Sequence, residues 1–274
     1  MKAMRISIAA AAAVAVSLGL ISLTGSVNAA AAPTTKGTLR PAIHLAHKAG
    51  MSPQGIPIQY SGNWSGYVAT PKKGGAKSFR YVAASYEVPS VNCSVTNYAF
   101  SYHWVGLDGW TDGTVEQDGI GSFCNGSTPD YFAWAWMYPS PGEVKQIAVN
   151  AGDSITSTVS YASGVYTLKL TDHTTGKHFD VTSAGTDSNA SAEAITEGYP
   201  SPPTENGTAD FGTEHYHSVK VTSSSGAVGG LTGSGWSTDE FVSYGASGDV
   251  DTQPGPLTTT SGGSSFKVTW LHEN

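Results

Sequence analysis

The sequence predicts an all-β fold in a single domain that follows a short leader. From about residue 59 onward, Ser, Thr, Gly, Tyr and Val dominate and charged residues are sparse. Short runs rich in β-branched and aromatic residues recur through this region, and Gly, Pro, Asn and Asp separate them. No segment shows a sustained helical period. This pattern is typical of an antiparallel sandwich or barrel.

The expected strands are the runs in which β-branched and aromatic residues concentrate. They cover residues 64–69, 79–88, 98–105, 131–138, 154–161, 166–171, 190–197, 209–213, 217–222 and 266–271, with a further strand-like segment at 115–119. The stretch 222–265 is dense in Gly and Ser, and we interpret it as loops around the late strands.

The first 29 residues have the pattern of a signal peptide. Lys2 and Arg5 precede an apolar stretch over residues 6–23, and small residues around Ala29 form a cleavage site. No later segment is apolar and long enough to span a bilayer. We therefore expect residues 1–29 to be removed, and the product to be secreted to the extracellular space with no membrane attachment.

Residues 30–58 differ in charge from the rest of the chain. They carry three basic residues and no acidic one, whereas residues 59–274 carry nine basic residues and all 21 acidic ones, a net charge of −12. The stretch is either a flexible leader or a basic pro-segment that docks on the acidic domain of residues 59–274. Acid would release a docked segment, because protonation of the carboxylates removes the attraction.

Cys93 and Cys124 are the two cysteines of the chain. In an exported protein such a pair is expected to form a disulfide, which would close a loop of about 30 residues and stabilise the fold by roughly 3 to 4 kcal/mol. A cysteine nucleophile is therefore not expected.

Motif searches exclude several kinds of catalytic site. The chain has no G-x-S-x-G elbow, no H-E-x-x-H zinc helix, no Asp-Thr-Gly or Asp-Ser-Gly loop and no phosphate-binding glycine loop. His215 and His217 would share one strand face and could ligate a metal, but a polar strand face explains them equally well. We expect no metal, no cofactor, no nucleic-acid partner and a monomer.

Seven short motifs follow one another along the chain. They are Asn63-Trp64-Ser65-Gly66, Tyr86-Glu87-Val88-Pro89, Trp104-Val105-Gly106-Leu107-Asp108-Gly109, Glu116-Gln117-Asp118-Gly119, Ala133-Trp134-Ala135-Trp136-Met137-Tyr138-Pro139, Ala192-Glu193-Ala194-Ile195 and Ala209-Asp210-Phe211-Gly212. Their order and spacing resemble those of the glutamic peptidases, or eqolisins.

The resemblance implies a two-sheet antiparallel β-sandwich, similar to the concanavalin-type jelly roll, with substrate across the concave sheet. It also implies a catalytic pair, which maps to Gln117 and Glu193. An ionised Glu193 would take a proton from the attacking water and return it to the leaving amine. The Gln117 amide would donate a hydrogen bond to the oxyanion.

Three neighbours are assigned to substrate binding by the same resemblance. Trp104 would wall the cleft, Asp108 would lie nearby, and Trp64 would lie beside the site. Each residue also has a structural explanation, since the tryptophans could be core aromatics and Asp108 could set a turn before Gly109.

The chain also departs from the family pattern. Gly121 stands where the family commonly has an aspartate, Ala194 stands where it usually has a tryptophan, and the spacing from Trp104 to Gln117 is one residue shorter than in the fungal members. These departures leave substrate preference and catalytic strength open.

Two glutamates compete with the catalytic assignment. Glu197 lies four residues after Glu193, and strand alternation places both on one face. The order of the motifs favours Glu193. Glu116 should point to the face opposite Gln117, as a solvated carboxylate.

The sequence thus predicts a secreted, acid-acting, metal-free endopeptidase that acts on polypeptide substrates and is made with a basic pro-segment. The alternatives are a jelly-roll glycoside hydrolase with two carboxyl groups and a non-catalytic carbohydrate-binding protein. Gln117 argues against the hydrolase, because an amide cannot serve as acid or nucleophile.

Overall fold

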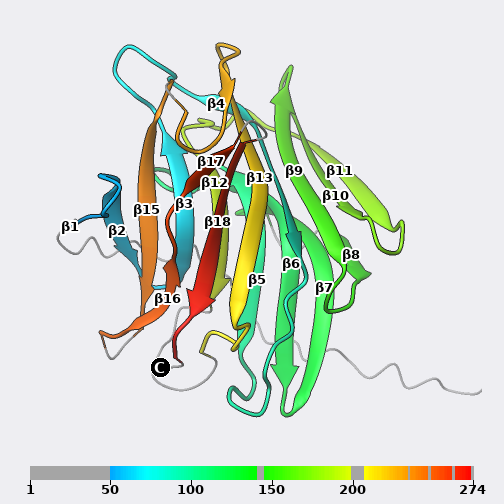
Figure 1. Cartoon of the computed structure of the whole chain (residues 1–274). Coiled ribbons are helices and arrows are strands. Elements are labelled where there is room, and N and C mark those ends of the chain that lie inside the picture. Colours follow the sequence, from blue (N-terminus) through cyan, green and yellow to red (C-terminus); the bar gives the residue numbers. More distant parts are fainter. Residues whose placement is uncertain are drawn as a thin grey trace, which may run out of the picture. The chain divides into compact units, whose positions relative to one another are not determined.

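A computed structural model describes residues 50–140, 145–198, 207–233, 235–245, 248–260 and 263–272, and every named element in this part of the chain is a β-strand (Figure 1). The predicted signal peptide and the leader up to residue 49 lie outside the described residues. No helix in the described segments is long and apolar enough to cross a membrane.

The strands are β1 Gly50–Met51, β2 Pro57–Ser61, β3 Trp64–Thr70, β4 Phe79–Glu87, β5 Phe100–Leu107, β6 Val115–Asn125, β7 Thr128–Tyr138, β8 Lys145–Ala148, β9 Ser154–Ala162, β10 Val165–Asp172, β11 His178–Ala184, β12 Ala192–Gly198, β13 Thr213–Ser223, β14 Val228–Gly229, β15 Ser237–Tyr244, β16 Val250–Pro254, β17 Thr258–Thr260 and β18 Gly263–Trp270.

Backbone pairing joins the strands into one continuous series with two long runs. The first run has the order β8-β7-β6-β5-β12-β3-β15-β2-β1, and the second has the order β16-β18-β13-β4-β9-β10-β11. The runs are connected because β15 pairs with β16 as well as with β3. All of these pairs are antiparallel except β15 with β2, which is parallel. The predicted all-β, antiparallel class is confirmed.

The core lies where the two runs face each other, with β5 and β6 against β9 and β10. Along β9 and β10, buried side chains alternate with more exposed ones, as expected for strands with one face in the core. Ile155, Val159, Leu168 and Leu170 supply this face and are fully buried, as is Ile120 from β6. Strands β3, β5, β6 and β12 are buried on both faces over most of their length.

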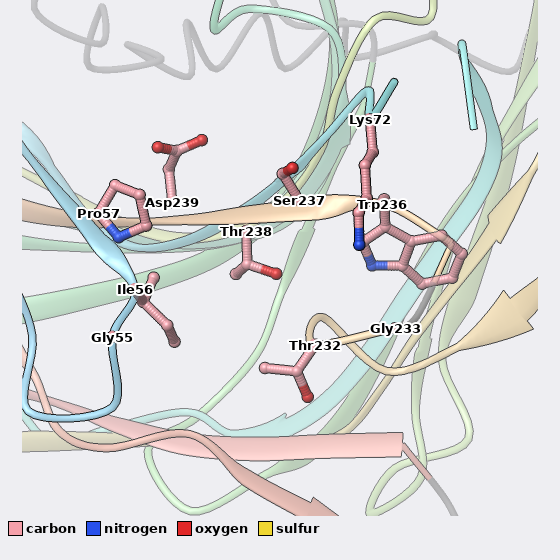
Figure 2. Close-up of a pocket in the computed structure, with 10 residues that line it drawn as sticks. All are labelled: Gly55, Ile56, Pro57, Lys72, Thr232, Gly233, Trp236, Ser237, Thr238 and Asp239. Atoms are coloured by element: carbon pink, nitrogen blue, oxygen red, sulfur yellow. The ribbon is translucent and has the colours of Figure 1, made fainter. Parts of the chain in front are cut away.

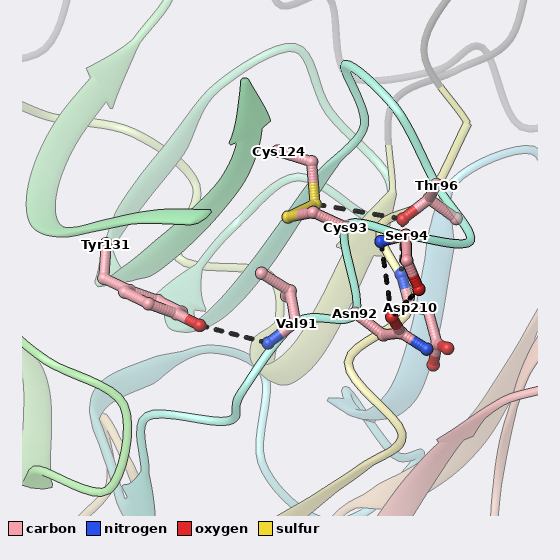
Figure 3. Close-up of a disulfide and its surroundings, with 8 residues drawn as sticks. All are labelled: Val91, Asn92, Cys93, Ser94, Thr96, Cys124, Tyr131 and Asp210. Atoms are coloured by element: carbon pink, nitrogen blue, oxygen red, sulfur yellow. Dashed lines mark hydrogen bonds between the residues drawn. A yellow bond between two sulfur atoms is a disulfide. The ribbon is translucent and has the colours of Figure 1, made fainter. Parts of the chain in front are cut away.

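The predicted disulfide forms between Cys93, in the segment after β4, and Cys124 near the end of β6 (Figure 3). Around it, the Tyr131 hydroxyl accepts a hydrogen bond from the backbone N–H of Val91 at 3.2 Å, and the Thr96 hydroxyl accepts one from that of Asp210 at 3.1 Å. The bridge therefore ties the β4–β5 connection to the strand that carries Gln117.

Three expectations about strand placement are corrected. Residues 209–212 form no strand, and β13 begins only at Thr213. The Gly- and Ser-rich stretch 222–265 contains β15, which pairs with β3 and β2 in the first run. Strand β2 begins at Pro57, so the last residues assigned to the leader are part of the β structure.

The interior holds carboxyl groups with no basic partner. Asp118 is fully buried on the core face of β6, and Glu214 of β13 is almost fully buried. Burial raises the pKa of both groups well above its usual range. No lysine or arginine in the described residues forms an ion pair with either. Burial also raises the pKa of further carboxyl groups, namely those of Asp108, Glu116, Glu193, Glu197, Glu240 and Asp251.

This arrangement predicts that the fold is most stable in acid. Above about pH 4 the unfolded chain releases its carboxyl protons, while the folded chain retains those on the buried groups, so stability falls as pH rises towards neutrality. Buried His103 acts in the opposite sense, because burial lowers its pKa to about 3. As pH falls below about 6.5, the unfolded chain protonates this histidine while the folded chain does not, so His103 lowers the stability of the fold in acid. The thermal unfolding midpoint should peak near pH 4 and fall most steeply on the neutral side.

The variant Asp118→Asn tests this prediction, because it removes one buried ionisation. Measured by chemical denaturation, its free energy of unfolding should decline less between pH 4 and 7, by up to about 1.4 kcal/mol per pH unit for one proton. Asp180→Asn is the matched control, since Asp180 lies at the surface and pairs with Lys169 at 3.6 Å. An unchanged slope in Asp118→Asn would contradict the explanation.

Candidate active site

Gln117 and Glu193 lie in one row of paired residues across the first run of strands. Glu193 of β12 pairs with Gly106 of β5, and Gly106 pairs with Gln117 of β6. Directly paired residues of antiparallel strands point to the same face, so both side chains lie on the outer face, away from the core. The structure thus brings the two residues of the predicted pair onto one surface.

Glu193 is nevertheless enclosed. Its side chain is 0% exposed, and neither carboxyl oxygen has a hydrogen-bond partner in the described part of the chain. Burial raises the pKa of this carboxyl well above its ordinary value, against an opposing contribution from the Ser191 hydroxyl, and the carboxylates of Asp108, Asp112 and Glu116 raise it further. A carboxyl in this setting remains protonated in acid and out of contact with water.

Trp104 also separates Glu193 from Gln117. Gly106 stands between them in the row, and a Cβ placed on Gly106 would lie 2.8 Å from Cζ3 of the Trp104 ring. The six-membered part of the indole therefore covers the space that a side chain at position 106 would fill. Gly106 is required for this ring position, because any larger residue would push the indole away.

Glu197 has a different environment, at the other end of the same indole. Its carboxylate accepts hydrogen bonds from Asn63 Nδ2 at 2.7 Å and from Trp104 Nε1 at 3.0 Å, and the side chain is half-buried. Burial raises the pKa of Glu197 to about 7, while the Trp104, Trp64 and Asn63 side chains all act to lower it. N–H donors of this kind favour the ionised carboxylate.

The two tryptophans assigned to substrate binding lie beside Glu197, since Trp64 is its paired residue on β3 and Trp104 donates a hydrogen bond to it. Trp64 is 1% exposed and Trp104 is 0% exposed, and their rings meet edge to face with centroids 5.1 Å apart. Trp64 also packs against Phe241 of β15. Together these rings form an apolar base that supports the carboxylate, in which Trp104 contributes a donor as well.

Asp108 has a well-defined structural partner. It follows β5 with a positive φ of 66° and is fully buried. Its carboxylate accepts hydrogen bonds from the backbone N–H groups of Asn189 at 2.7 Å and Ala190 at 2.5 Å. Burial raises the pKa of Asp108 to about 7, and these two bonds oppose the rise. Asp108 therefore holds the chain that enters β12, just before Glu193.

Glu116 points to the face opposite Gln117, as predicted, but it is not solvated. It pairs with Leu107 of β5 and is 1% exposed, and burial raises its pKa to about 9. The prediction of a solvated carboxylate was wrong because the opposite face of β6 packs against β10 and is not open to water.

Asn63 was missed as a site residue. It is fully buried in the turn before β3, and the Ser61 hydroxyl donates a hydrogen bond to its Oδ1 at 3.1 Å. This contact directs its Nδ2 towards Glu197. The sequence contained one signal, since Asn63 begins the first of the seven motifs.

Two other features lie apart from this row. His215 and His217 have ring centroids 5.8 Å apart on β13, and the described residues contain no group of three or more His, Cys, Asp or Glu side chains arranged to hold a metal ion. Figure 2 shows a pocket of about 330 Å³ whose lining includes Lys72, Trp236 and Asp239. None of its lining residues comes from β5, β6 or β12, so it is separate from the candidate site.

Comparison with known proteins supports one family. The model of the peptidase A4 family matches residues 62–264. Aspergillopepsin-2 of Aspergillus niger is 29% identical over 243 residues, which cover 78% of this chain and 79% of that protein.

Solved structures agree with this result. Scytalido-glutamic peptidase, in complex with a peptide-based transition-state analogue, has a TM-score of 0.61 at 23% identity, over 77% of this chain and 98% of that one. Aspergilloglutamic peptidase from Aspergillus niger has a TM-score of 0.51 at 25% identity, over 63% of this chain and 99% of that one. The chain therefore belongs to the peptidase A4 family, the glutamic peptidases or eqolisins, which hydrolyse peptide bonds.

Proposed function

We propose that this glutamic peptidase is a secreted, acid-acting endopeptidase in which Gln117 and Glu197 carry the reaction. The observation behind this assignment is the environment of Glu197, a half-buried carboxylate on the outer face that accepts hydrogen bonds from Asn63 and Trp104. Motif order alone ranked Glu193 first. The geometry favours Glu197, because Glu193 is enclosed and only the Ser191 hydroxyl acts to support its ionised form, whereas Glu197 accepts two N–H hydrogen bonds.

Trp104 accounts for how Glu197 can act together with Gln117. Trp104 pairs with Ile195, which lies between Glu193 and Glu197 in β12. The bond from its indole N–H therefore draws the Glu197 carboxylate back along the strand, while the other end of the same ring lies over Gly106, beside Gln117. The rigid Trp104 side chain thus spans the distance between the Glu197 carboxylate and the Gln117 amide.

The chemistry requires one ionisable and one neutral group. Ionised Glu197 would take a proton from a water molecule as it attacks the scissile carbonyl, and would then deliver this proton to the departing amine. Gln117 carries no charge at any pH, and its amide N–H donates to the carbonyl oxygen as negative charge develops. The outer face of β12, β5 and β6 would be the concave surface of a jelly roll across which the polypeptide lies.

Acid action is supported by the buried carboxyl groups. The fold is expected to be most stable near pH 4, and its loss of stability towards neutral pH would set an upper pH limit on activity. The hydrogen-bond donors to Glu197 favour its ionised form, so this carboxyl is ionised in a fraction of the enzyme molecules in acid.

We propose that the basic leader is a pro-segment that ends before Gly50. Residues Gly50–Met51 and Pro57–Ser61 already pair within the β structure, so they belong to the enzyme domain. The acidic domain would attract the basic segment near neutral pH and release it as its carboxylates become protonated.

Substitution of the two glutamates tests the assignment of the base. Glu197→Gln should abolish cleavage of an acid-denatured protein substrate between pH 2 and 7, measured with EDTA present, because the amide cannot accept a proton. Glu193→Gln is the matched control and should retain turnover. Activity in Glu197→Gln together with its loss in a folded Glu193→Gln would return the role of base to Glu193. No cleavage by the folded, pro-segment-free wild type at any pH would remove the endopeptidase proposal.

Gln117→Ala tests the oxyanion role. The rate constant kcat should fall about 100- to 1000-fold, as is typical when one oxyanion donor is lost. Gln117→Glu keeps the length of the side chain but replaces the amide donor. When the introduced carboxyl is ionised it cannot donate a hydrogen bond, so kcat should remain low. A decrease in kcat of less than about threefold in Gln117→Ala would exclude this role.

Trp104→Phe should shift the pH dependence of activity. Loss of the indole N–H removes a hydrogen bond that favours ionised Glu197, so the pKa of this carboxyl should rise. The acid limb of kcat/KM should then move to higher pH, because kcat/KM reports ionisation in the free enzyme. The control Trp236→Phe lies outside the site, where its indole donates to the Leu231 carbonyl, and should leave this limb in place. An unmoved limb in a folded Trp104→Phe would contradict the proposal.

A further inference from the structure

A group of aromatic side chains continues the outer face beside Glu197. Tyr102 of β5 pairs with Glu197 and with Gly121 of β6, and Gly121 pairs with Phe132 of β7. Phe100 pairs with Phe123 two positions further along, so these two side chains point to the same face. The aromatic group therefore begins at the residue paired with the proposed base.

The rings of this group contact one another. Phe100 and Phe123 stack with centroids 4.2 Å apart, Phe100 and Tyr102 are nearly parallel at 6.1 Å, and Tyr102 meets Phe132 edge to face at 6.1 Å. Tyr102 is 9% exposed, whereas Phe100, Phe123 and Phe132 are half-buried. Half-buried aromatic rings gain free energy when a further apolar group covers them.

Gly121 allows the group to close over β6. A Cβ at this position would lie 2.5 and 2.7 Å from Cζ and Cε2 of Phe132, and 3.0 Å from Cε1 of Tyr102. Real Cβ contacts are longer, so any other residue would displace the Phe132 ring. The absence of a side chain at position 121 thus lets the Phe132 ring reach Tyr102, the residue paired with Glu197.

The charge of this surface limits what it can bind. In the paired rows that hold these aromatic residues, the carboxyl groups are Glu197 at one end and Asp130, paired with Phe123, at the other. Between them the surface is aromatic. A large apolar side chain can cover the rings, whereas burying a carboxylate against them costs the free energy of its desolvation.

We propose that Phe100, Tyr102, Phe123 and Phe132 form a subsite that binds an aromatic or large aliphatic side chain of the substrate, and that Gly121 is the residue that determines this specificity. The inference rests on the proposed function, since it places the subsite on the Glu197 side of the scissile bond. A substrate residue seated on the rings would position the neighbouring peptide bond between Glu197 and Gln117.

The test uses a set of peptides that differ only in the residues flanking one cleavable bond, with Phe, Leu, Ala, Lys or Asp at each position in turn. With the wild-type enzyme in acid, kcat/KM for Phe or Leu at one position should exceed that for Ala by at least about tenfold, as expected for an apolar pocket. Lys and Asp at that position should rank below Ala. Equal rates for Phe and Ala at both positions, or a preference for Lys, would overturn the inference while leaving the endopeptidase proposal intact.

Two variants assign this preference to the rings. Phe132→Ala and Gly121→Ala should each lower kcat/KM for the Phe peptide about tenfold and change that for the Ala peptide less than twofold. If Gly121 acts through Phe132, the double variant should be no worse than Phe132→Ala alone, since the two substitutions act on the same contact. An equal loss for both peptides, in enzyme with an unchanged unfolding midpoint, would count against the subsite.

Controls separate folding and catalysis from recognition. Tyr60→Ala removes an aromatic ring of β2 that packs on Tyr244, away from these rows, and should leave the preference unchanged. Phe132→Leu replaces Phe132→Ala if the latter fails to fold, and should retain part of the preference. Calorimetric binding of the peptides to Glu197→Gln provides a readout without turnover. Tighter binding of the Phe peptide there, lost in Glu197→Gln/Gly121→Ala, would support the subsite even if the wild type proved not to cleave peptides.

Discussion

The placement of β12 between β3 and β5 is the constraint on which the candidate site depends. It brings together three segments that are far apart in the sequence, and its register determines which side chains reach the outer face. Asp108 holds the chain at the start of the strand, and the bonds from Asn63 and Trp104 hold Glu197 near its end. A shift by one residue would turn both glutamates of β12 into the core, because the side-chain period of a strand is two.

The second constraint is the protonation state of the carboxyl groups that are buried in the interior. Burial raises the pKa of Asp118 and Glu214, and among the described residues neither group forms an ion pair with a lysine or arginine. The same effect acts on Glu197, where burial opposes the ionisation that a general base needs. Hydrogen bonds from the side-chain N–H groups of Asn63 and Trp104 oppose this rise in the pKa of Glu197, as backbone N–H groups do for Asp108.

Much of the fold could be predicted from the sequence, and the reasons are local. Strands such as β9 and β10 show alternating burial, and two cysteines in a chain with a predicted signal peptide indicate one bridge. Strand β15 was missed because its pairing with β3 and β2 is a long-range contact that a Gly- and Ser-rich neighbourhood conceals. The choice between Glu193 and Glu197 could not be made from periodicity, since residues four apart share a face and only their contacts differ.

The parallel pairing of β2 with β15 would limit where the proposed pro-segment can be removed. Residues 58–61 pair with Glu240 to Ser243 along the side of β15 that faces away from β3. A cut after residue 58 would detach β1 and the first half of β2, and would leave backbone N–H and C=O groups of β15 unpaired at an edge. Such an edge recruits strands from other chains. Removal of the proposed pro-segment at that point would produce an enzyme prone to self-association, so the length of the N-terminal arm that remains would affect solubility.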